Sequence, residues 1–312
     1  MLQREYLILS ALIAGIACGS ESAFAAEGGS SDYLPGTAGD FGIALPPKPG
    51  PQVANIIWYQ SGRVDTAVLQ GAVNVGLDVT VALDLVAGFY TFEEPVFGAV
   101  YTIGAVVPFG YAELSADITG PGGGTISAKA DAFNLSDMAI TPLQLNWTHE
   151  KFSFKFSETI IVPTGAYSTS DIVNLGRNYW AFDTNLAMTW LNPQTGTEFS
   201  AQAGVMYNTK NHATNYKTGT EFHLDYVANQ FVSETFALGI RGYWYQQLTG
   251  DSGSGAILGA FKSSSAGIGP GFLWTPAAAG GKLAIAGKWI HDFHAENRFE
   301  SDYGILTLGW TF

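Results

Sequence analysis

Apolar and polar residues alternate in two consecutive runs between Lys217 and Gly250. In the first run the apolar positions are Phe222, Leu224, Tyr226 and Ala228. In the second run they are Phe236, Leu238, Ile240 and Trp244. A two-residue repeat is typical of β-strands, whose side chains point to opposite faces in turn. The pattern therefore predicts strands at 217–229 and 233–248, and it permits either a soluble sandwich or an outer-membrane barrel.

The same alternation predicts twelve strands between Val53 and Phe312. They span residues 53–61, 76–91, 96–116, 136–148, 151–163, 178–191, 196–209, 217–229, 233–248, 260–275, 281–294 and 301–312. The stretch from Pro95 to Ala112 has no charge, but Gly98, Gly104 and Pro108 interrupt it. We interpret it as a long strand and not as a membrane helix.

The connections between these strands alternate in length. Long connections are expected at 62–75, 117–135, 164–177 and 249–259, and short ones at 92–95, 149–150, 192–195, 230–232 and 276–280. Outer-membrane barrels combine short periplasmic turns with longer outer loops, whereas a soluble sandwich has no reason to sort its loops in this way. The sequence thus predicts an all-β fold, a transmembrane antiparallel up-and-down β-barrel of about twelve strands with both termini in the periplasm.

The N-terminus indicates export. Arg4 precedes an apolar run, and Ala23-Phe24-Ala25 forms a cleavage site of the small-residue type, so residues 1–25 are predicted to be a signal peptide. A single membrane anchor and a lipoprotein signal at Cys18 are the alternatives. Residues 26–52, rich in Gly, Ser and Pro, are expected to form an irregular periplasmic leader or a partial plug of the barrel at 53–312.

Composition agrees with a membrane-facing surface. Hydrophobic residues make up 47% of the chain and charged residues only 13%, about half the share found in soluble domains. The formal net charge of −13 argues against nucleic acid as a partner. The single cysteine falls in the signal peptide, so no disulfide is expected in the mature chain.

The last predicted strand ends on an aromatic residue. Leu306, Leu308, Trp310 and Phe312 share one face. This pattern is similar to the terminal strand signal that the barrel assembly machinery reads, so we expect that machinery to recognise Phe312. Outer-membrane lipid is the expected surrounding, in a Gram-negative bacterium.

Several segments resemble those of the outer-membrane transporters associated with the meta-cleavage (MetA) pathway of phenol degradation. They are residues 163–167 (PTGAY), 174–182 (NLGRNYWAF), 216–226 (YKTGTEFHLDY), 242–255 (GYWYQQLTGDSGSG), 268–270 (IGP) and 295–298 (AENR). The resemblance runs from about Val53 to Phe312. It implies an outer-membrane barrel that passes aromatic or other hydrophobic small molecules.

Charged residues on the polar face of the strands are candidates for a constriction of the lumen. They are Glu221, His223, Asp225, Arg241, Lys288 and Asp292. Pairing about a turn at 230–232 would place Glu221 opposite Arg241, so that their charges set a field across the pore. The alternative is a ladder of ion pairs that only stiffens the wall.

Three tyrosines on the same face, Tyr179, Tyr243 and Tyr245, are candidates for stacking on aromatic solutes. Alternatively they fill space and form hydrogen bonds. The outward tryptophans are expected to lie in interfacial girdles.

We predict no catalytic residue, no metal site and no cofactor. The loop from Gly250 to Gly253 has a serine between glycines, but such a motif needs a positioned histidine and acid. A calcium site at Asp251 is an alternative use of this loop. His291 and His294 lie three residues apart on a strand and therefore face opposite sides.

The predicted function is passive uptake of small aromatic or hydrophobic molecules across the outer membrane, without enzymatic activity. Two alternatives remain from the sequence alone. A lipid hydrolase would need a Ser–His pair on adjacent strands at the lipid face, and a structural or adhesive barrel would have a lumen filled by paired side chains.

Overall fold

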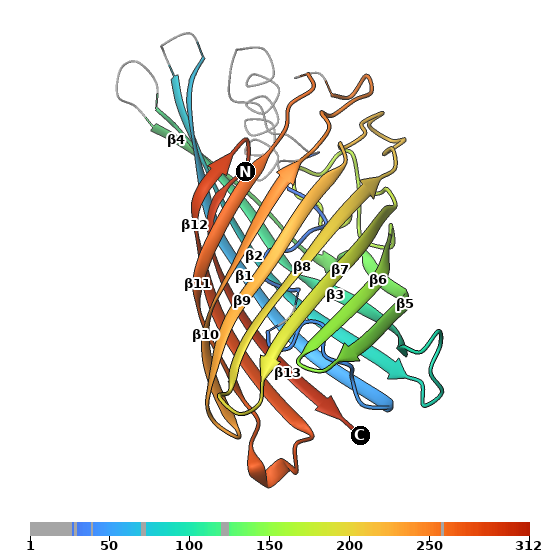
Figure 1. Ribbon diagram of the computed structural model, residues 1–312. Helices are drawn as coiled ribbons and strands as arrows, with labels where there is room; N and C mark the ends of the chain where they lie inside the picture. The colour runs from blue at the N-terminus through green and yellow to red at the C-terminus, as the bar shows by residue number, and fades with distance from the viewer. Residues whose placement is uncertain (1–26, 28–29, 39, 70–72, 120–124, 257–258) are drawn as a thin grey trace.

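The computed structural model describes residues 27, 30–38, 40–69, 73–119, 125–256 and 259–312. Within these ranges the chain forms one antiparallel sheet that closes into a barrel, because β1 pairs with β13 on one side and with β2 on the other (Figure 1). Twelve strand positions surround the lumen, so the predicted all-β barrel is confirmed. The predicted signal peptide lies outside the described residues.

The strands follow one another around the barrel. Their bounds are β1 Gly50–Leu69, β2 Val73–Thr91, β3 Val100–Thr119, β4 Thr125–Leu135, β5 Met138–His149, β6 Phe152–Val162, β7 Ala181–Asn192, β8 Thr197–Asn208, β9 Glu221–Ser233, β10 Phe236–Gln247, β11 Ser264–Trp274, β12 Leu283–Glu296 and β13 Glu300–Thr311. A short 3-10 turn, η2 (Ala277–Ala279), connects β11 to β12 at the lower end in Figure 1. The upper connections at 163–180, 209–220 and 248–263 are longer than the lower turns at 150–151, 193–196 and 234–235.

One strand position is occupied by two strands. β4 pairs with the upper half of β3, from Phe109 to Thr119, and β5 pairs with its lower half. Ser136 and Asp137 separate the two strands. The loop at 163–180 covers this break, because the Asp137 carboxylate accepts hydrogen bonds from the backbone N–H groups of Gly165 (2.8 Å) and Arg177 (2.6 Å).

Two of the predicted long loops are wrong. Residues 62–75 belong mostly to β1 and β2, and residues 117–135 contain β4 and the end of β3. Ala128 and Ala130 on β4 are buried while Lys129 and Asp131 are exposed, so the two-residue repeat is present. It was missed because alanine has too small an apolar surface to stand out as the buried half of the pattern.

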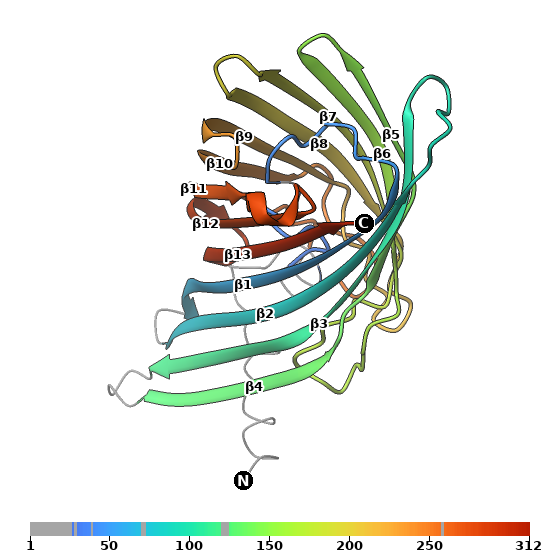
Figure 2. The same cartoon turned by 90° about the horizontal axis from the view of Figure 1, so that it is seen from below.

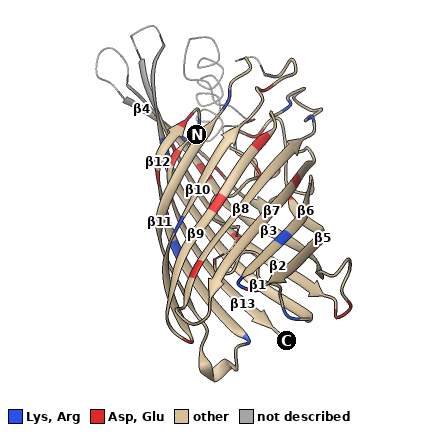
Figure 3. Ribbon diagram, viewed as in Figure 1, with Lys and Arg blue, Asp and Glu red and all other residues tan. Residues whose placement is uncertain are grey.

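Burial along β9 separates a barrel from a soluble sandwich. The polar residues Glu221, His223 and Asp225 are buried, whereas their apolar neighbours Phe222 and Leu224 are partly exposed. A soluble sheet would bury the opposite face. Large apolar side chains cover the outside of the barrel, and charges are sparse on the strands in Figure 3. This exterior fits lipid and not water.

No helix within the described ranges is long and apolar enough to cross a membrane.

Candidate transport lumen

The N-terminal segment, residues 27–49, lies inside the barrel. In Figure 2 its blue trace crosses the space enclosed by the strands. Its upper end is bound by Arg177 from the 163–180 loop, whose Nη2 donates to Ser30 Oγ at 2.7 Å and whose Nε lies 3.6 Å from Asp32 Oδ1. Arg177 Nη1 also donates to the Glu27 carbonyl oxygen at 3.2 Å. The upper end of the segment is therefore tied to an outer loop by a charge-assisted network.

The middle of the segment contacts the inner face of β9. Ser31 Oγ donates to Glu221 Oε2 at 2.7 Å, and the Tyr33 hydroxyl donates to Asp225 Oδ1 at 3.1 Å. The Tyr33 ring is stacked on the His223 imidazole with centroids 4.4 Å apart. Candidate lumen residues of β9 thus hold the segment in place through one carboxylate oxygen each of Glu221 and Asp225 and through the His223 ring, whose Nε2 lies 3.0 Å from Asp183 Oδ1 of β7.

The lower part of the segment contacts the candidate residues on β10 and β12. Asp40 forms an ion pair with Lys288 of β12, and its carbonyl oxygen accepts a hydrogen bond from Arg241 Nη2 at 2.8 Å. The Arg241 guanidinium also lies over the Phe41 ring, 4.3 Å from its centroid. Farther along, the Gly42 N–H donates to Glu198 Oε1 at 2.6 Å. These bonds fix the segment from the upper loops down to the lower end of the barrel.

Gly36 allows the segment to pass close to the wall. Its φ is +78°, a left-handed conformation that side chains rarely adopt. A Cβ at this position would lie 2.7 Å from Ile290 Cδ1 and 2.9 Å from Ile305 Cδ1. The left-handed backbone therefore favours glycine, and a larger residue would also require the two isoleucine methyl groups to shift.

The predicted pairing of Glu221 with Arg241 is wrong. The β9–β10 turn lies at 234–235, so Glu221 is opposite Gln247 and Arg241 is opposite Val227. The register differs from the prediction by an even number of residues, and an even shift leaves every side chain on the same face. Both charges consequently lie inside the barrel, but each binds the N-terminal segment and not the other.

The remaining candidates also lie inside. Asp292 accepts a hydrogen bond from the Tyr243 hydroxyl, and its Oδ2 accepts one from the Ser301 N–H at 3.0 Å. Tyr245 is covered by the Arg298 guanidinium, 4.2 Å from the ring centroid, and is stacked on Tyr33. Tyr179 is 3% exposed. Because these rings already contact protein groups, their role in solute stacking stays a prediction.

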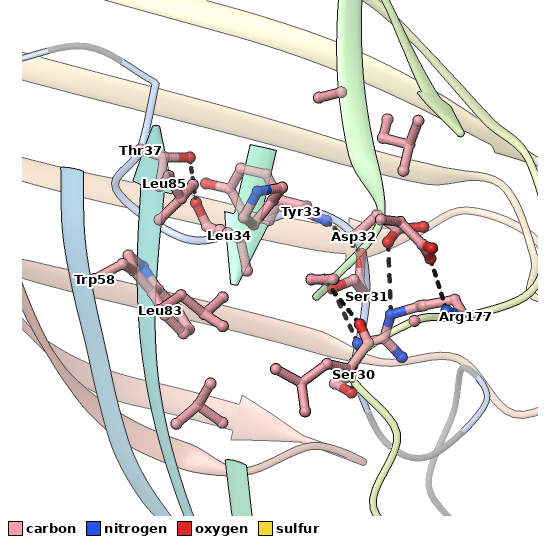
Figure 4. Close-up of a pocket in the computed structure, with 18 of the residues that line it drawn as sticks. Ser30, Ser31, Asp32, Tyr33, Leu34, Thr37, Trp58, Leu83, Leu85 and Arg177 are labelled. Atoms are coloured by element: carbon pink, nitrogen blue, oxygen red, sulfur yellow. Dashed lines mark hydrogen bonds and ion pairs between the residues drawn. The ribbon is translucent and has the colours of Figure 1, made fainter. Parts of the chain in front are cut away.

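A cavity of about 710 Å³ lies beside the N-terminal segment. One wall is apolar and comes from the first strands: Trp58 of β1, Leu83 and Leu85 of β2, and Val106 of β3. Figure 4 shows Trp58, Leu83 and Leu85 beside Leu34 of the segment, with the Asp32–Arg177 pair at the other end of the view. The indole N–H of Trp58 donates to the Pro35 carbonyl oxygen at 3.1 Å, which holds the ring in place.

A second wall of the cavity, which adjoins the first where β5 pairs with β3, is polar. It is formed by Gln144, Lys155, Ser157, Thr159, Asn185 and Gln202, on strands β5 to β8. The volume is within the range of pockets that enclose small organic molecules, which combine a mostly apolar lining with a few placed polar groups. An amphipathic cavity of this kind suits a solute with an apolar body.

Sequence reasoning missed the residues that join the segment to the wall. Asp32, Tyr33 and Arg177 lie in irregular stretches, where no two-residue repeat indicates which way a side chain points. The only signal was that Arg177 falls within the 174–182 segment that carries the family resemblance.

Asp32 makes the seating of the segment dependent on pH. Burial raises the pKa of Asp32 to about 7; Arg177 lowers it, and Asp137 and Glu221 raise it. Because the pKa of Asp32 is raised when the segment is bound in the lumen, the bound segment carries more protons than the released one. The stability due to Asp32 is therefore complete below a pH equal to its ordinary pKa of 3.8, and it is lost as the pH rises through about 7.

We therefore expect the segment to dissociate from the inner wall of the barrel more often at about pH 8 than at about pH 5. The measurement is the rate at which a maleimide reagent labels Ala44→Cys, because Ala44 is fully buried by the segment's contacts. At each pH this rate is divided by the rate for a free thiol, since the thiolate fraction itself rises with pH. An Asp32→Asn variant should show a much flatter pH dependence, and an unchanged slope in that variant would contradict the assignment to Asp32.

The structure bears on two alternatives raised by the sequence, a hydrolase site and a metal site. Ser264 Oγ lies 2.9 Å from His294 Nε2 on the adjacent strand, but no carboxylate of the described chain is hydrogen-bonded to that imidazole. The pair lacks the third group that orients a catalytic histidine.

Among the described residues no group of three or more His, Cys, Asp or Glu side chains could hold a metal ion. Asp251 instead accepts hydrogen bonds from Tyr216, Gly219 and Gln247.

A family model assigns the chain to a family, and one solved structure shares its fold. A family model described as "Putative MetA-pathway of phenol degradation" matches residues 61–308, so the resemblance seen in the sequence is confirmed. The crystal structure of the COG4313 outer membrane channel from Pseudomonas putida F1 is similar, with a TM-score of 0.66 and 15% identity over 90% of this chain and 100% of that chain. The β domain of the Bordetella autotransporter BrkA has a TM-score of 0.46 and 12% identity over 84% of this chain and 99% of that chain.

A search of curated protein sequences found no match. The barrel fold and its apolar exterior together place the chain in the outer membrane of a Gram-negative bacterium.

Proposed function

We propose that this chain, which belongs to the MetA-pathway phenol-degradation family, is a passive outer-membrane channel for small aromatic or other hydrophobic molecules. The observation that carries the proposal is the amphipathic cavity within the barrel. A general porin has a polar, water-filled lumen, whereas here Trp58, Leu83 and Leu85 form an apolar wall. An apolar wall lowers the free energy of a dehydrated ring relative to that of a sugar.

The N-terminal segment is the gate in this proposal. It contacts β9 through Ser31 and Tyr33, β12 through Asp40 and β8 through Gly42, so it lies across the path of a solute. The cavity can receive a solute while the segment is seated, and transfer to the periplasm requires the segment to shift. Polar contacts suit this role because water can replace them when the segment leaves.

The barrel assembly machinery and outer-membrane lipid are the proposed partners in biogenesis. Phe312 ends the last strand with an exposed ring, and its N–H donates to the Pro51 carbonyl oxygen at 3.2 Å. The proposed assembly role of Phe312 is supported by its aromatic side chain, which is exposed next to the end of β13. We propose no catalytic role, because the Ser264–His294 pair has no acid partner within the described residues.

Transport by the wild-type protein is tested with vesicles whose outer leaflet contains lipopolysaccharide, which slows the background entry of hydrophobic solutes. We expect phenol to enter several-fold faster than in protein-free vesicles, and faster than a neutral sugar of comparable size. Equal entry of phenol and sugar would contradict the aromatic preference. No entry of phenol above the protein-free rate would contradict the channel itself.

A further inference from the structure

Lys155 stands out among the charged residues that line the cavity. It lies on β6 near the lower turn, opposite Asn146 of β5 and Ala187 of β7 in the backbone register. Its side chain belongs to the polar wall of the cavity, whose other wall is formed by apolar residues of β1 to β3. Within the described part of the chain, its ammonium group has neither a hydrogen bond nor an ion pair.

The other cations that line the cavity already have partners. Arg177 binds Asp32 and the segment backbone, and His223 lies 3.0 Å from Asp183 and 3.7 Å from Asp225. Arg298 lies over the Tyr245 ring, with the carboxylates of Glu221 and Asp292 in its surroundings. Each of these groups has its charge balanced by the protein.

Asp225 is the carboxylate whose charge acts on Lys155, but the two groups form no ion pair. Asp225 Oδ1 accepts a hydrogen bond from Tyr33 and its Oδ2 lies 3.7 Å from His223 Nδ1, while Asp183 is held by His223 and Asn185. A cation in a partly dehydrated cavity is costly unless an anion compensates it. Lys155 is therefore positioned to bind an anion that the protein itself does not supply.

We propose that Lys155 binds the carboxylate of an amphipathic organic acid, such as an aromatic carboxylate, whose apolar body lies in the cavity. This inference rests on the proposed function and names a class of solute for the same cavity. The ammonium group donates charge-assisted hydrogen bonds to the carboxylate, and Gln144 and Ser157 provide further polar groups on the same wall. The ring is directed toward the apolar wall, which removes its surface from water.

The test compares two ligands that share one carbon skeleton, phenylacetate and phenylethanol. Binding is measured by calorimetry at about pH 7, where the acid is ionised, with the full mature chain in lipid nanodiscs and empty nanodiscs as the blank. We expect Lys155→Met to weaken phenylacetate binding by about tenfold and to leave phenylethanol binding unchanged, since only the charged head group loses its partner.

Two variants complete the experiment. Lys151→Met removes an exposed lysine from the neighbouring β5–β6 turn, so it should bind both ligands as the wild type does. Lys155→Arg keeps the charge and should retain most of the preference for phenylacetate.

The outcomes separate this inference from the proposed function. If Lys155→Met binds phenylacetate as tightly as the wild type, or the wild type prefers phenylethanol, the carboxylate site is wrong while the channel for neutral aromatics stands. If the wild type binds neither ligand and passes no phenol, both proposals are wrong.

Discussion

Removing residues 27–47 is expected to raise the single-channel conductance of the barrel several-fold. In the intact protein the segment is hydrogen-bonded to side chains of Glu198, Glu221 and Asp225 on the inner wall. Without the segment, water fills this space and hydrates the same carboxylates, so the lumen conducts ions along its full length. The measurement is conductance in planar bilayers for the wild type and the deletion variant.

The deletion leaves every strand in place, because β1 begins at Gly50. Folding of the variant is checked by its altered migration in gels before and after heating, as for other barrels. A variant that folds and yet conducts no better than the wild type would show that something other than the segment closes the lumen.

Replacing Arg177 with methionine is expected to release the upper end of the segment. The Asp32 side chain is 8% exposed and the Arg177 side chain 21%, so the pair is mostly shielded from water. At about pH 8, above the pKa of about 7 of Asp32, removing Arg177 leaves a carboxylate that must take up a proton to stay buried. The lost hydrogen bonds and this protonation cost about 1–3 kcal/mol, so labelling of Ala44→Cys by maleimide should accelerate by about tenfold or more.

Two comparisons identify the cause. Adding Asp32→Asn to Arg177→Met removes the unpaired carboxylate and should return the labelling rate part of the way to that of the parent. Lys129→Met breaks an ion pair with Glu113 whose lysine is 55% exposed, and exposed pairs contribute only about 0–1 kcal/mol. Equal acceleration in Lys129→Met and Arg177→Met would contradict a specific role for Arg177.

The sequence predicts the wall of this barrel far better than its contents. On β9 and β10 the two-residue repeat is strong, so it identifies the inner face of Glu221 and Arg241 even though the predicted turn was misplaced. On β4 the repeat is carried by Ala128 and Ala130, and the strand was taken for a loop. The two-residue repeat identifies the inner face of a strand only where the buried and exposed side chains differ clearly in polarity.

The contacts between the N-terminal segment and the wall have no comparable pattern in the sequence. Tyr33 meets His223 from a position 190 residues away in the chain, and Asp40 meets Lys288 from farther still. No local pattern encodes such contacts, because an irregular segment has no repeat that fixes its side-chain directions. The leader was expected to be a possible plug from its Gly and Pro content alone, and which wall residues it contacts could be read only from the structure.

The central claim is that aromatic solutes cross when the N-terminal segment moves. Ala44 and Ala187 pack in one cluster, so cysteines are introduced at both positions to lock the segment to β7, and closure of the disulfide is verified by loss of free thiol. The only native cysteine, Cys18, lies in the predicted signal peptide. The decisive measurement is phenol entry into lipopolysaccharide vesicles that carry this double-cysteine variant, before and after reduction. The account predicts no entry above background while the disulfide is closed and a wild-type rate once it is reduced. Phenol entry at the wild-type rate through the locked protein would contradict it.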